Sequence, residues 1–119
     1  MIKGIGTDII EIARINKYIQ NKNFVNKIYT KEEQKLYNGN NPESLAGNFA
    51  CKEAIVKAFG TGFKGCKPTE IEILRSNNGK PYVNLYSNAN EIFKSMGCNS
   101  ILVSISHNKD NAVAFAIIE

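Results

Sequence analysis

The sequence predicts an α+β fold: a single compact domain in which an antiparallel or mixed sheet is wrapped around one long helix. Three observations lead to this prediction. A long apolar stripe of helical period lies between Pro42 and Gly60, and segments of alternating apolar and polar residues predict strands nearer both termini. The length of 119 residues, 43% of them hydrophobic, is that of one globular domain, which we assign to residues 1–119.

The first third of the chain predicts a strand and two helices. Residues 2–6 indicate an opening strand, and the isoleucines that follow recur every three or four residues, as in an amphipathic helix. Asp8 is therefore expected at the junction between this strand and helix, where it would either cap the helix or contact a ligand. Thr30 and Glu33 have the spacing of a capping box, which predicts a second, short helix.

The long helix has recognisable start and stop signals. Pro42 suits the first helical position, Asn41 is a candidate N-terminal cap, and Gly60 suits a C-terminal stop. Its predicted apolar face consists of Leu45, Ala46, Phe49, Ala50, Ala54, Ala58 and Phe59.

The C-terminal half predicts a hairpin, a helix and a second strand pair. The hairpin turns at Asn77-Asn78-Gly79, and the helix ends at Gly97. The predicted strands are 69–75, 82–86, 101–106 and 112–118, and the predicted helix is 88–96.

Composition and charge exclude several classes of protein. A net charge of +4 suits an acidic partner or a phosphorylated ligand, but scattered lysines without an arginine-rich run argue against nucleic acid. There is no apolar run of roughly 20 residues and no signal-peptide pattern, so we expect a cytoplasmic protein without a membrane partner. Three cysteines and one histidine support neither a disulfide framework nor a zinc site, so we expect buried or half-buried thiols at Cys51, Cys66 and Cys98.

Two carboxylates and a lysine are the first candidates for chemistry. Phe49, Glu53 and Lys57 are spaced by four, which places them on one helix face. Glu53 and Lys57 could form an ordinary surface ion pair, but their apolar neighbours favour a position at the margin of the core. Asp8 and Glu53, with a lysine nearby and no cluster of His or Cys, suit Mg²⁺, which shares one or two carboxylates with substrate phosphates.

Two further segments offer polar groups at the ends of strands. His107 follows Ser104-Ile105-Ser106, where a strand gives way to a loop, and could contact a phosphate, carry a proton or have no task. The turn Gly79-Lys80-Pro81 could be only a hairpin connection, or it could offer backbone amides and an ammonium to a ligand.

Four blocks together resemble the holo-[acyl-carrier-protein] synthases, the small bacterial type of 4′-phosphopantetheinyl transferase. They are GIGTDIIEIARI, LAGNFACKEAIVKAFGTG, NNGKPYV and SILVSISHNKDNAVAFAIIE, and they span nearly the whole chain. The resemblance implies transfer of the 4′-phosphopantetheine arm from coenzyme A to a serine hydroxyl of apo acyl carrier protein. The second product would be adenosine 3′,5′-bisphosphate, and the role would lie in fatty acid biosynthesis.

The resemblance also implies roles for particular residues, in a homotrimer with sites at the subunit clefts. Asp8 and Glu53 match Mg²⁺ ligands, and with Lys57 they would form the catalytic set. The residues matching positions that bind coenzyme A are Lys57, Gly79, Lys80, Pro81 and His107. The proton acceptor stays open between Glu53, a metal-bound water and His107.

Two further expectations concern a surface for a protein partner and one residue that departs from the family pattern. Arg14, Lys17 and Tyr18 lie on one side of the first helix and would face an acidic acyl carrier protein, unless they form only a solvated amphipathic face. Asn48 stands where the family commonly has an arginine. We expect this to weaken the affinity for coenzyme A without abolishing activity.

Two other functions use the same residues differently. A Mg²⁺-dependent hydrolase of nucleotide pyrophosphates would employ the same carboxylates with water as the nucleophile. A non-catalytic basic trimer could instead bind acidic proteins or RNA, in which case Asp8 would be only a helix cap and Glu53 and Lys57 only an ion pair.

Overall fold

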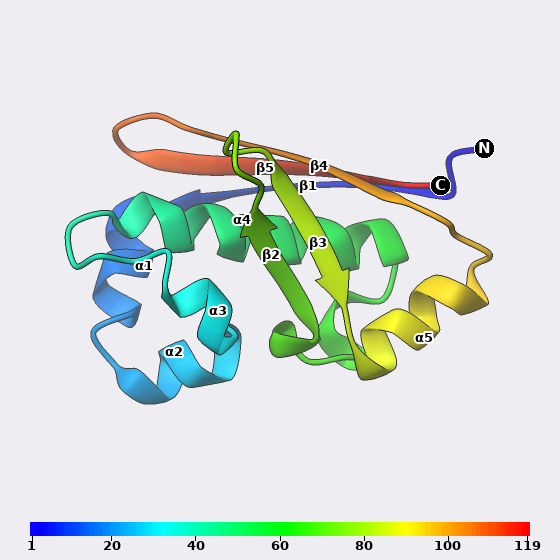
Figure 1. The fold of residues 1–119 in the computed structure, drawn as a ribbon, viewed down its shortest axis with the longest axis horizontal. Coiled ribbons are helices and arrows are strands. Elements are labelled where there is room, and N and C mark those ends of the chain that lie inside the picture. The colour runs from blue at the N-terminus through cyan, green and yellow to red at the C-terminus, as the bar shows by residue number, and fades with distance from the viewer.

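The computed structural model describes all residues, 1–119, and is organised around α4 (Pro42–Phe59). A three-stranded antiparallel sheet of order β1-β5-β4 lies along one side of this helix, and the antiparallel pair β2-β3 crosses another side (Figure 1). The predicted α+β class is thus confirmed, and because every pairing is antiparallel, the mixed alternative does not occur. The strands are β1 (Gly4–Glu11), β2 (Ile71–Arg75), β3 (Pro81–Leu85), β4 (Ile101–His107) and β5 (Asn111–Ile118).

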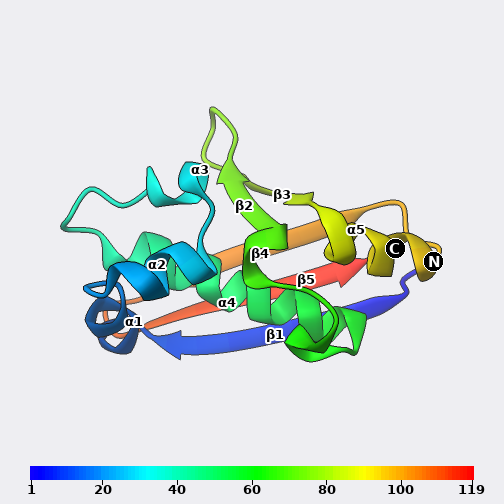
Figure 2. The same ribbon diagram turned by 90° about the horizontal axis from the view of Figure 1, so that it is seen from below.

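The remaining helices cover the two ends of α4. Three short helices gather at the end of the molecule that lies away from the N- and C-termini (Figure 2). α5 follows the β2-β3 pair, and two 3₁₀ turns at 62–64 and 68–70 connect α4 to β2. The helices are α1 (Ile12–Tyr18), α2 (Lys22–Ile28), α3 (Lys31–Gln34) and α5 (Ser87–Ser95).

The first strand is longer than the sequence predicted. Pairing with β5 continues from Gly4 as far as Glu11, so the helix begins only at Ile12. Ile9 is consequently exposed on the strand. The predicted position of Asp8 at a strand-helix junction is wrong, and so is its alternative role as a helix cap, because the backbone there is held in the sheet ladder.

Two glycines bring β1 against the backbone of α4. A Cβ atom at Gly4 would lie 2.2 Å from the carbonyl oxygen of Ala58, and one at Gly6 would lie 1.8 Å from that of Ala54. Both distances are far inside van der Waals contact, so only glycine permits this approach. The strand therefore carries Asp8 close to the helix.

The signals for the ends of helices are confirmed in part. Pro42 occupies the first turn of α4, and Gly60 ends it in the left-handed region with φ +80°. Asn41 does not cap the helix with its side chain, which accepts the Asn38 N–H at 2.7 Å and donates to the Leu36 carbonyl at 2.8 Å. Helix α2 was not predicted; its N-terminus is capped by the side chain of Asn21.

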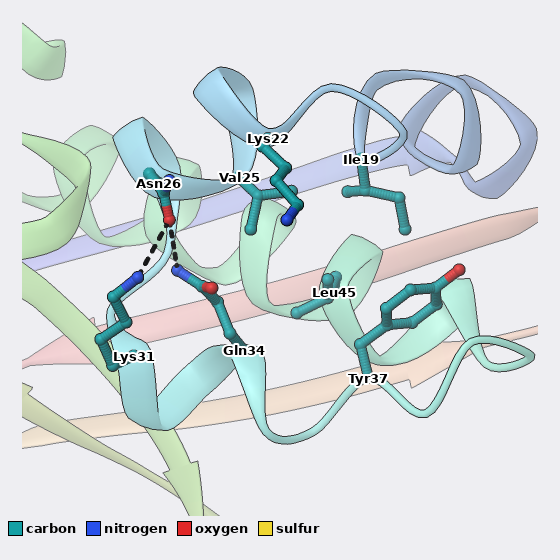
Figure 3. A pocket seen from close by; sticks show the side chains of 8 residues that line it. All are labelled: Ile19, Lys22, Val25, Asn26, Lys31, Gln34, Tyr37 and Leu45. Carbon is teal, nitrogen blue, oxygen red and sulfur yellow. Dashed lines mark hydrogen bonds between the residues drawn. The ribbon is translucent and has the colours of Figure 1, made fainter.

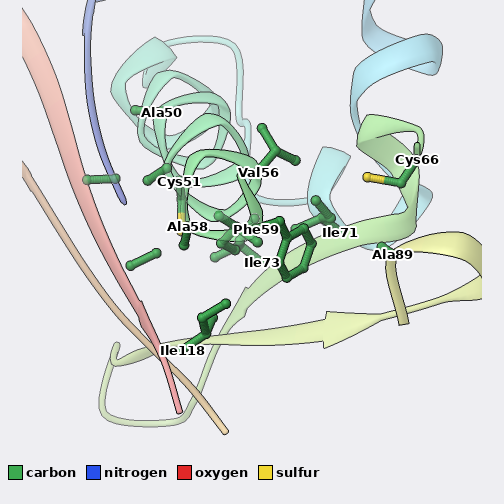
Figure 4. Close-up of a cluster of buried hydrophobic side chains, with 14 of the residues drawn as sticks. Ala50, Cys51, Val56, Ala58, Phe59, Cys66, Ile71, Ile73, Ala89 and Ile118 are labelled. Carbon is green, nitrogen blue, oxygen red and sulfur yellow. The ribbon is translucent and has the colours of Figure 1, made fainter. Parts of the chain in front are cut away.

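The main core surrounds the C-terminal half of α4 and consists largely of small and β-branched side chains (Figure 4). Alanines of β5 alternate toward the helix, so the sheet and helix pack closely. All three cysteines are buried and free, as expected. No helix has the length and apolar character needed to cross a membrane.

A buried polar network joins α3, α4 and β2. The predicted Thr30–Glu33 capping box is present, and the Glu33 carboxylate is fully buried. It accepts hydrogen bonds from Lys52 Nζ at 2.7 Å and from Asn48 Nδ2 at 2.9 Å. Lys52 also donates to the carbonyls of Pro68 and Ile71, and no buried side-chain polar atom lacks a partner.

Candidate active site

The open surface of α4 is a narrow stripe. After the first turn, the helix residues that are not buried are Phe49, Glu53 and Lys57. The predicted spacing by four on one face is therefore confirmed, and the stripe interrupts an otherwise enclosed helix. The buried residues on both sides of the stripe place the Glu53 carboxylate and the Lys57 ammonium at the margin of the core.

Asp8 reaches this stripe from β1. The Nζ of Lys57 donates to Asp8 Oδ1 at 3.1 Å and to the backbone carbonyl of Thr7 at 3.0 Å. The side chain of Asp8 is 19% exposed and that of Lys57 is 53% exposed. Lys57 thus pairs with Asp8 across the two elements, and the alternative of a Glu53–Lys57 surface pair is wrong.

Glu53 has neither an ion-pair partner nor a hydrogen bond from a side chain. Burial raises the pKa of its carboxyl, the nearby charge of Asp8 raises it further, and Lys57 offsets part of the effect. Two carboxylates that repel each other at the edge of the core are a candidate cation site.

The donor set fits Mg²⁺ better than a softer metal. No group of three or more His, Cys, Asp or Glu side chains is gathered anywhere in the chain. Mg²⁺ prefers oxygen ligands and commonly keeps several waters while sharing one or two carboxylates with substrate phosphates. Asp8 and Glu53 supply such carboxylates at a partly open position.

An apolar cleft of about 220 Å³ adjoins Glu53. Its aromatic residues Phe24 and Phe63 were not predicted as site residues, because they lie in short segments without a clear period. The Asn21 cap was the available signal for the helix that carries Phe24. The cleft is lined by Phe24, Ile28, Phe49, Lys52, Glu53, Phe63 and Pro68.

A row of aromatic rings connects this cleft to the first helix. The rings of Tyr18 and Phe24 have centroids 5.3 Å apart, and those of Phe24 and Phe49 are stacked at 6.4 Å. Arg14 Nε donates to the Tyr18 hydroxyl at 3.3 Å, which lowers the pKa of this phenol. Arg14 and Lys17 are exposed, so the basic end of α1 leads over aromatic surface toward Glu53.

The other predicted residues do not join this cluster within one chain. His107 is exposed at the end of β4, beside an open cleft of about 500 Å³ that also includes Pro42 and Glu43. The hairpin turn has Gly79 at φ +85° and Lys80 exposed. No side-chain hydrogen bond or ion pair links these residues to Asp8, Glu53 or Lys57.

Asn48 lies inside the protein rather than on a ligand-binding surface. It is fully buried, and its Nδ2 donates to Glu33 and to the Ile73 carbonyl, both at 2.9 Å. The structure therefore gives this residue a packing role that its sequence position did not reveal. A weaker affinity for coenzyme A stays a prediction.

A separate cleft of about 330 Å³ lies among α1, α2, α3 and the start of α4 (Figure 3). Lys31 and Gln34 both donate to Asn26 Oδ1 at its edge. None of the predicted site residues lines it. Its lining residues are Ile19, Lys22, Val25, Asn26, Lys31, Gln34, Tyr37 and Leu45.

Comparison with known proteins assigns the class of this fold. The family profile described as the 4′-phosphopantetheinyl transferase superfamily matches residues 4–116. A holo-[acyl-carrier-protein] synthase of Alkaliphilus oremlandii is 53% identical over 120 residues, covering 98% of each chain. One of Lachnoclostridium phytofermentans is 52% identical over 119 residues, covering 100% of this chain and 97% of the relative.

Solved structures agree with the sequence relatives. The holo-[acyl-carrier-protein] synthase of Neisseria meningitidis superposes with a TM-score of 0.90 at 33% identity, covering 100% of this chain and 99% of the other. That of Helicobacter pylori, in complex with coenzyme A, gives a TM-score of 0.86 at 31% identity, covering 97% and 99%. The chain therefore belongs to the 4′-phosphopantetheinyl transferase superfamily, in the family of the holo-[acyl-carrier-protein] synthases.

Proposed function

We propose that this enzyme transfers the 4′-phosphopantetheine group from coenzyme A to a serine hydroxyl of apo acyl carrier protein. The products are holo acyl carrier protein, which serves fatty acid biosynthesis, and adenosine 3′,5′-bisphosphate. The observation that carries the proposal is the cluster of Asp8, Glu53 and Lys57 on the open stripe of α4, where the Glu53 carboxylate has no cation of its own. Family membership supplies the reaction.

Asp8 and Glu53 are the proposed holders of Mg²⁺. Their carboxylates are close enough for the charge of Asp8 to raise the pKa of Glu53, which is the mutual repulsion that a bound cation relieves. When bound, Mg²⁺ would neutralise charge on the pyrophosphate of coenzyme A. Most of the remaining catalysis is alignment and charge neutralisation, as in other phosphoryl transfers.

Lys57 has a second role once a cation binds. In the free protein its ammonium is held by Asp8 Oδ1 and the Thr7 carbonyl. A metal on Asp8 would weaken this ion pair and leave the flexible, half-exposed lysine to neutralise a phosphate oxygen of coenzyme A. Among the candidate acceptors of the serine proton, Glu53 is supported by its position beside the cleft.

The acidic acyl carrier protein is proposed to approach over α1. Arg14, Lys17 and Tyr18 are exposed there. The aromatic row from Tyr18 to Phe49 leads from this basic surface to Glu53. Opposite charges would steer and orient the partner so that its serine arrives near the open stripe.

A homotrimer is proposed to complete the site. The face of the three-stranded sheet turned away from α4 exposes Ile5, Ile9, Leu102 and Phe115, each by more than half. Exposed apolar surface of this kind supports a subunit interface, and the family resemblance supplies the number three. Such an assembly would bring His107 and the Gly79-Lys80-Pro81 turn of one subunit to the cluster of another, where they would bind coenzyme A.

The compartment and the excluded partners follow from the same features. We propose a cytoplasmic enzyme, because its three cysteines are free thiols in a chain that has no disulfide. A membrane is not a proposed partner, since no helix is long and apolar enough to span one. Nucleic acid is not proposed either, since the scattered lysines form no basic stripe and there is no arginine-rich run.

The experiment that tests the function is a mass measurement on the carrier protein. Apo acyl carrier protein is incubated with coenzyme A, Mg²⁺ and the enzyme, beside Glu53→Gln and a control variant, Glu91→Gln, at an exposed position of α5. We expect a gain of one phosphopantetheine arm with the natural chain and with Glu91→Gln only. Cleavage of coenzyme A without carrier modification would instead indicate the hydrolase, and intact coenzyme A would indicate the binding module.

A further inference from the structure

The chain contains two Asn-Gly dipeptides, Asn38-Gly39 and Asn78-Gly79. Both are exposed, and both glycines have a positive φ, +98° at Gly39 and +85° at Gly79. An asparagine before glycine is prone to attack by the glycine nitrogen on its carboxamide, because glycine has no Cβ atom to obstruct the approach. The two dipeptides therefore share the sequence and the exposure that this reaction needs.

Both asparagine side chains are folded along the peptide bond that would be attacked. Asn38 Oδ1 accepts from the Asn40 N–H at 2.9 Å, and Asn78 Oδ1 accepts from the Lys80 N–H at 3.3 Å. A bond from an asparagine to the N–H two residues later closes an Asx turn, which keeps the carboxamide beside the intervening glycine nitrogen. The two electrophiles are therefore alike, so any difference between the sites lies in the glycine nitrogen.

The two glycine nitrogens differ in their hydrogen bonds. The Gly79 N–H donates to the Ser76 carbonyl at 2.9 Å, inside a turn that the bond from the Ser76 N–H to the Lys80 carbonyl closes at 2.9 Å. Gly39 lies outside every helix and strand, and its N–H donates to no backbone or side-chain acceptor. The nitrogen of Gly79 must therefore lose its hydrogen bond before it can attack, whereas the nitrogen of Gly39 has none to lose.

We propose that Asn38 is a site of spontaneous deamidation and that the hairpin turn protects Asn78 from the same reaction. The Gly39 nitrogen, after losing its proton to a base in the solvent, forms a bond to Cγ of Asn38. The bond from Cγ to Nδ2 breaks, and Nδ2 takes up a proton and leaves as ammonia. Water then opens the resulting succinimide ring at either of its two carbonyls, which yields aspartate or isoaspartate.

The modification adds a carboxylate beside an open cleft. Asn40, which bonds to the Asn38 side chain, lines the cleft of about 500 Å³ that also includes Pro42, Glu43 and His107. The isoaspartate product also lengthens the backbone by one methylene group in the segment that joins α3 to α4. The modified chain therefore carries an additional negative charge near His107, a proposed contact of coenzyme A.

Peptide mass spectrometry on the aged protein tests this proposal. The folded natural chain is incubated at mildly alkaline pH, and conversion at each asparagine is followed by the mass change from amide to acid. Asn38 should convert about five- to tenfold faster than Asn78, the factor expected where one backbone hydrogen bond must first break. In Asn38→Gln, whose longer side chain cyclises poorly, conversion should be lost at the first site and unchanged at Asn78.

Unfolding the natural chain provides the matched control. In concentrated urea neither dipeptide is held in a turn, and glycine follows both asparagines, so the two rates should become similar. Conversion of Asn78 that is as fast as that of Asn38 in the folded protein, or faster, would overturn the proposal. So would a difference that persists unchanged in urea, because it would then come from the local sequence rather than from the fold.

Discussion

Lys52 and Glu53 are neighbours on α4, yet they belong to opposite kinds of charge cluster. Lys52 is 1% exposed and donates to the Glu33 carboxylate and two backbone carbonyls. Glu53 is half-buried and has no cation paired with it, although Asp8 and Lys57 lie nearby. The enclosed charges are fully paired and hold α3, α4 and β2 together, whereas on the open stripe the Glu53 carboxylate has no paired cation and is the proposed ligand-binding group.

The enclosed cluster should have the larger effect on stability. Lys52→Met leaves the Glu33 carboxylate buried without its cation, which should lower the free energy of unfolding by about 3–5 kcal/mol. The measurement is equilibrium unfolding in urea. The matched control is Lys35→Met, which removes an exposed pair with Glu32 and should cost at most about 1 kcal/mol.

A double variant sharpens this prediction. Glu33→Gln combined with Lys52→Met removes both buried charges, so its loss of stability should be smaller than the sum of the two single losses. Equal destabilisation by Lys52→Met and Lys35→Met would contradict the view of Lys52 as an architectural charge.

The open cluster should have the larger effect on turnover. Glu53→Gln removes a proposed metal ligand and should reduce kcat by about 10²–10³-fold, a magnitude typical for one electrostatic contact to a transition state. The rate of mass gain on the carrier protein measures this effect, with Glu91→Gln as the reference. Turnover within twofold of that reference would exclude a metal-binding role for Glu53.

The same substitution, Glu53→Gln, should stabilise the folded protein although it slows turnover. The pKa of Glu53 is raised in the folded state, so the stability linked to this group is present below its unfolded pKa and is lost as pH rises through the folded value. Gln carries no such charge. Glu53→Gln should therefore gain stability relative to the natural chain as the pH rises above about 4, the ordinary pKa of a glutamate. Thermal unfolding without divalent metal follows this difference, and a relative loss with rising pH would refute the linkage.

The basic surface of α1 should give the smallest effect. Arg14→Glu places a carboxylate on the proposed path of an acidic partner, so association should slow by on the order of tenfold at low salt, and its salt dependence should flatten. Stopped-flow association at several salt concentrations provides the test, with Lys94→Glu as the remote control. If both variants respond alike to salt, the partner approaches by another face.

The local spacing of the residues in this site could be predicted from the sequence, but the contacts between distant segments could not. The spacing of Phe49, Glu53 and Lys57 determines a common helix face, and the structure confirms it. The partner of Lys57 could not be predicted, because Asp8 lies 49 positions away and reaches α4 only through the close packing of β1.

The buried hydrogen-bond network of Glu33, Asn48 and Lys52 could not be predicted, for the same reason. Thr30 and Glu33 were identified as a local cap, but the bond from Lys52 to Glu33 depends on how α3 folds back on α4. The length of β1 was missed because isoleucines three residues apart fit a helix, whereas the ladder with β5 decides in favour of a strand as far as Glu11.

A Mg²⁺ titration of the transfer rate would show whether Asp8 and Glu53 hold a metal ion on the open stripe of α4. The rate of mass gain on acyl carrier protein is measured against Mg²⁺ concentration for the natural chain, Asp8→Asn and Glu53→Gln. We predict saturation for the natural chain, with both variants needing far more Mg²⁺ or staying at background. Identical curves for the three proteins, or transfer that persists after complete removal of divalent metal, would exclude a catalytic metal site at these two carboxylates.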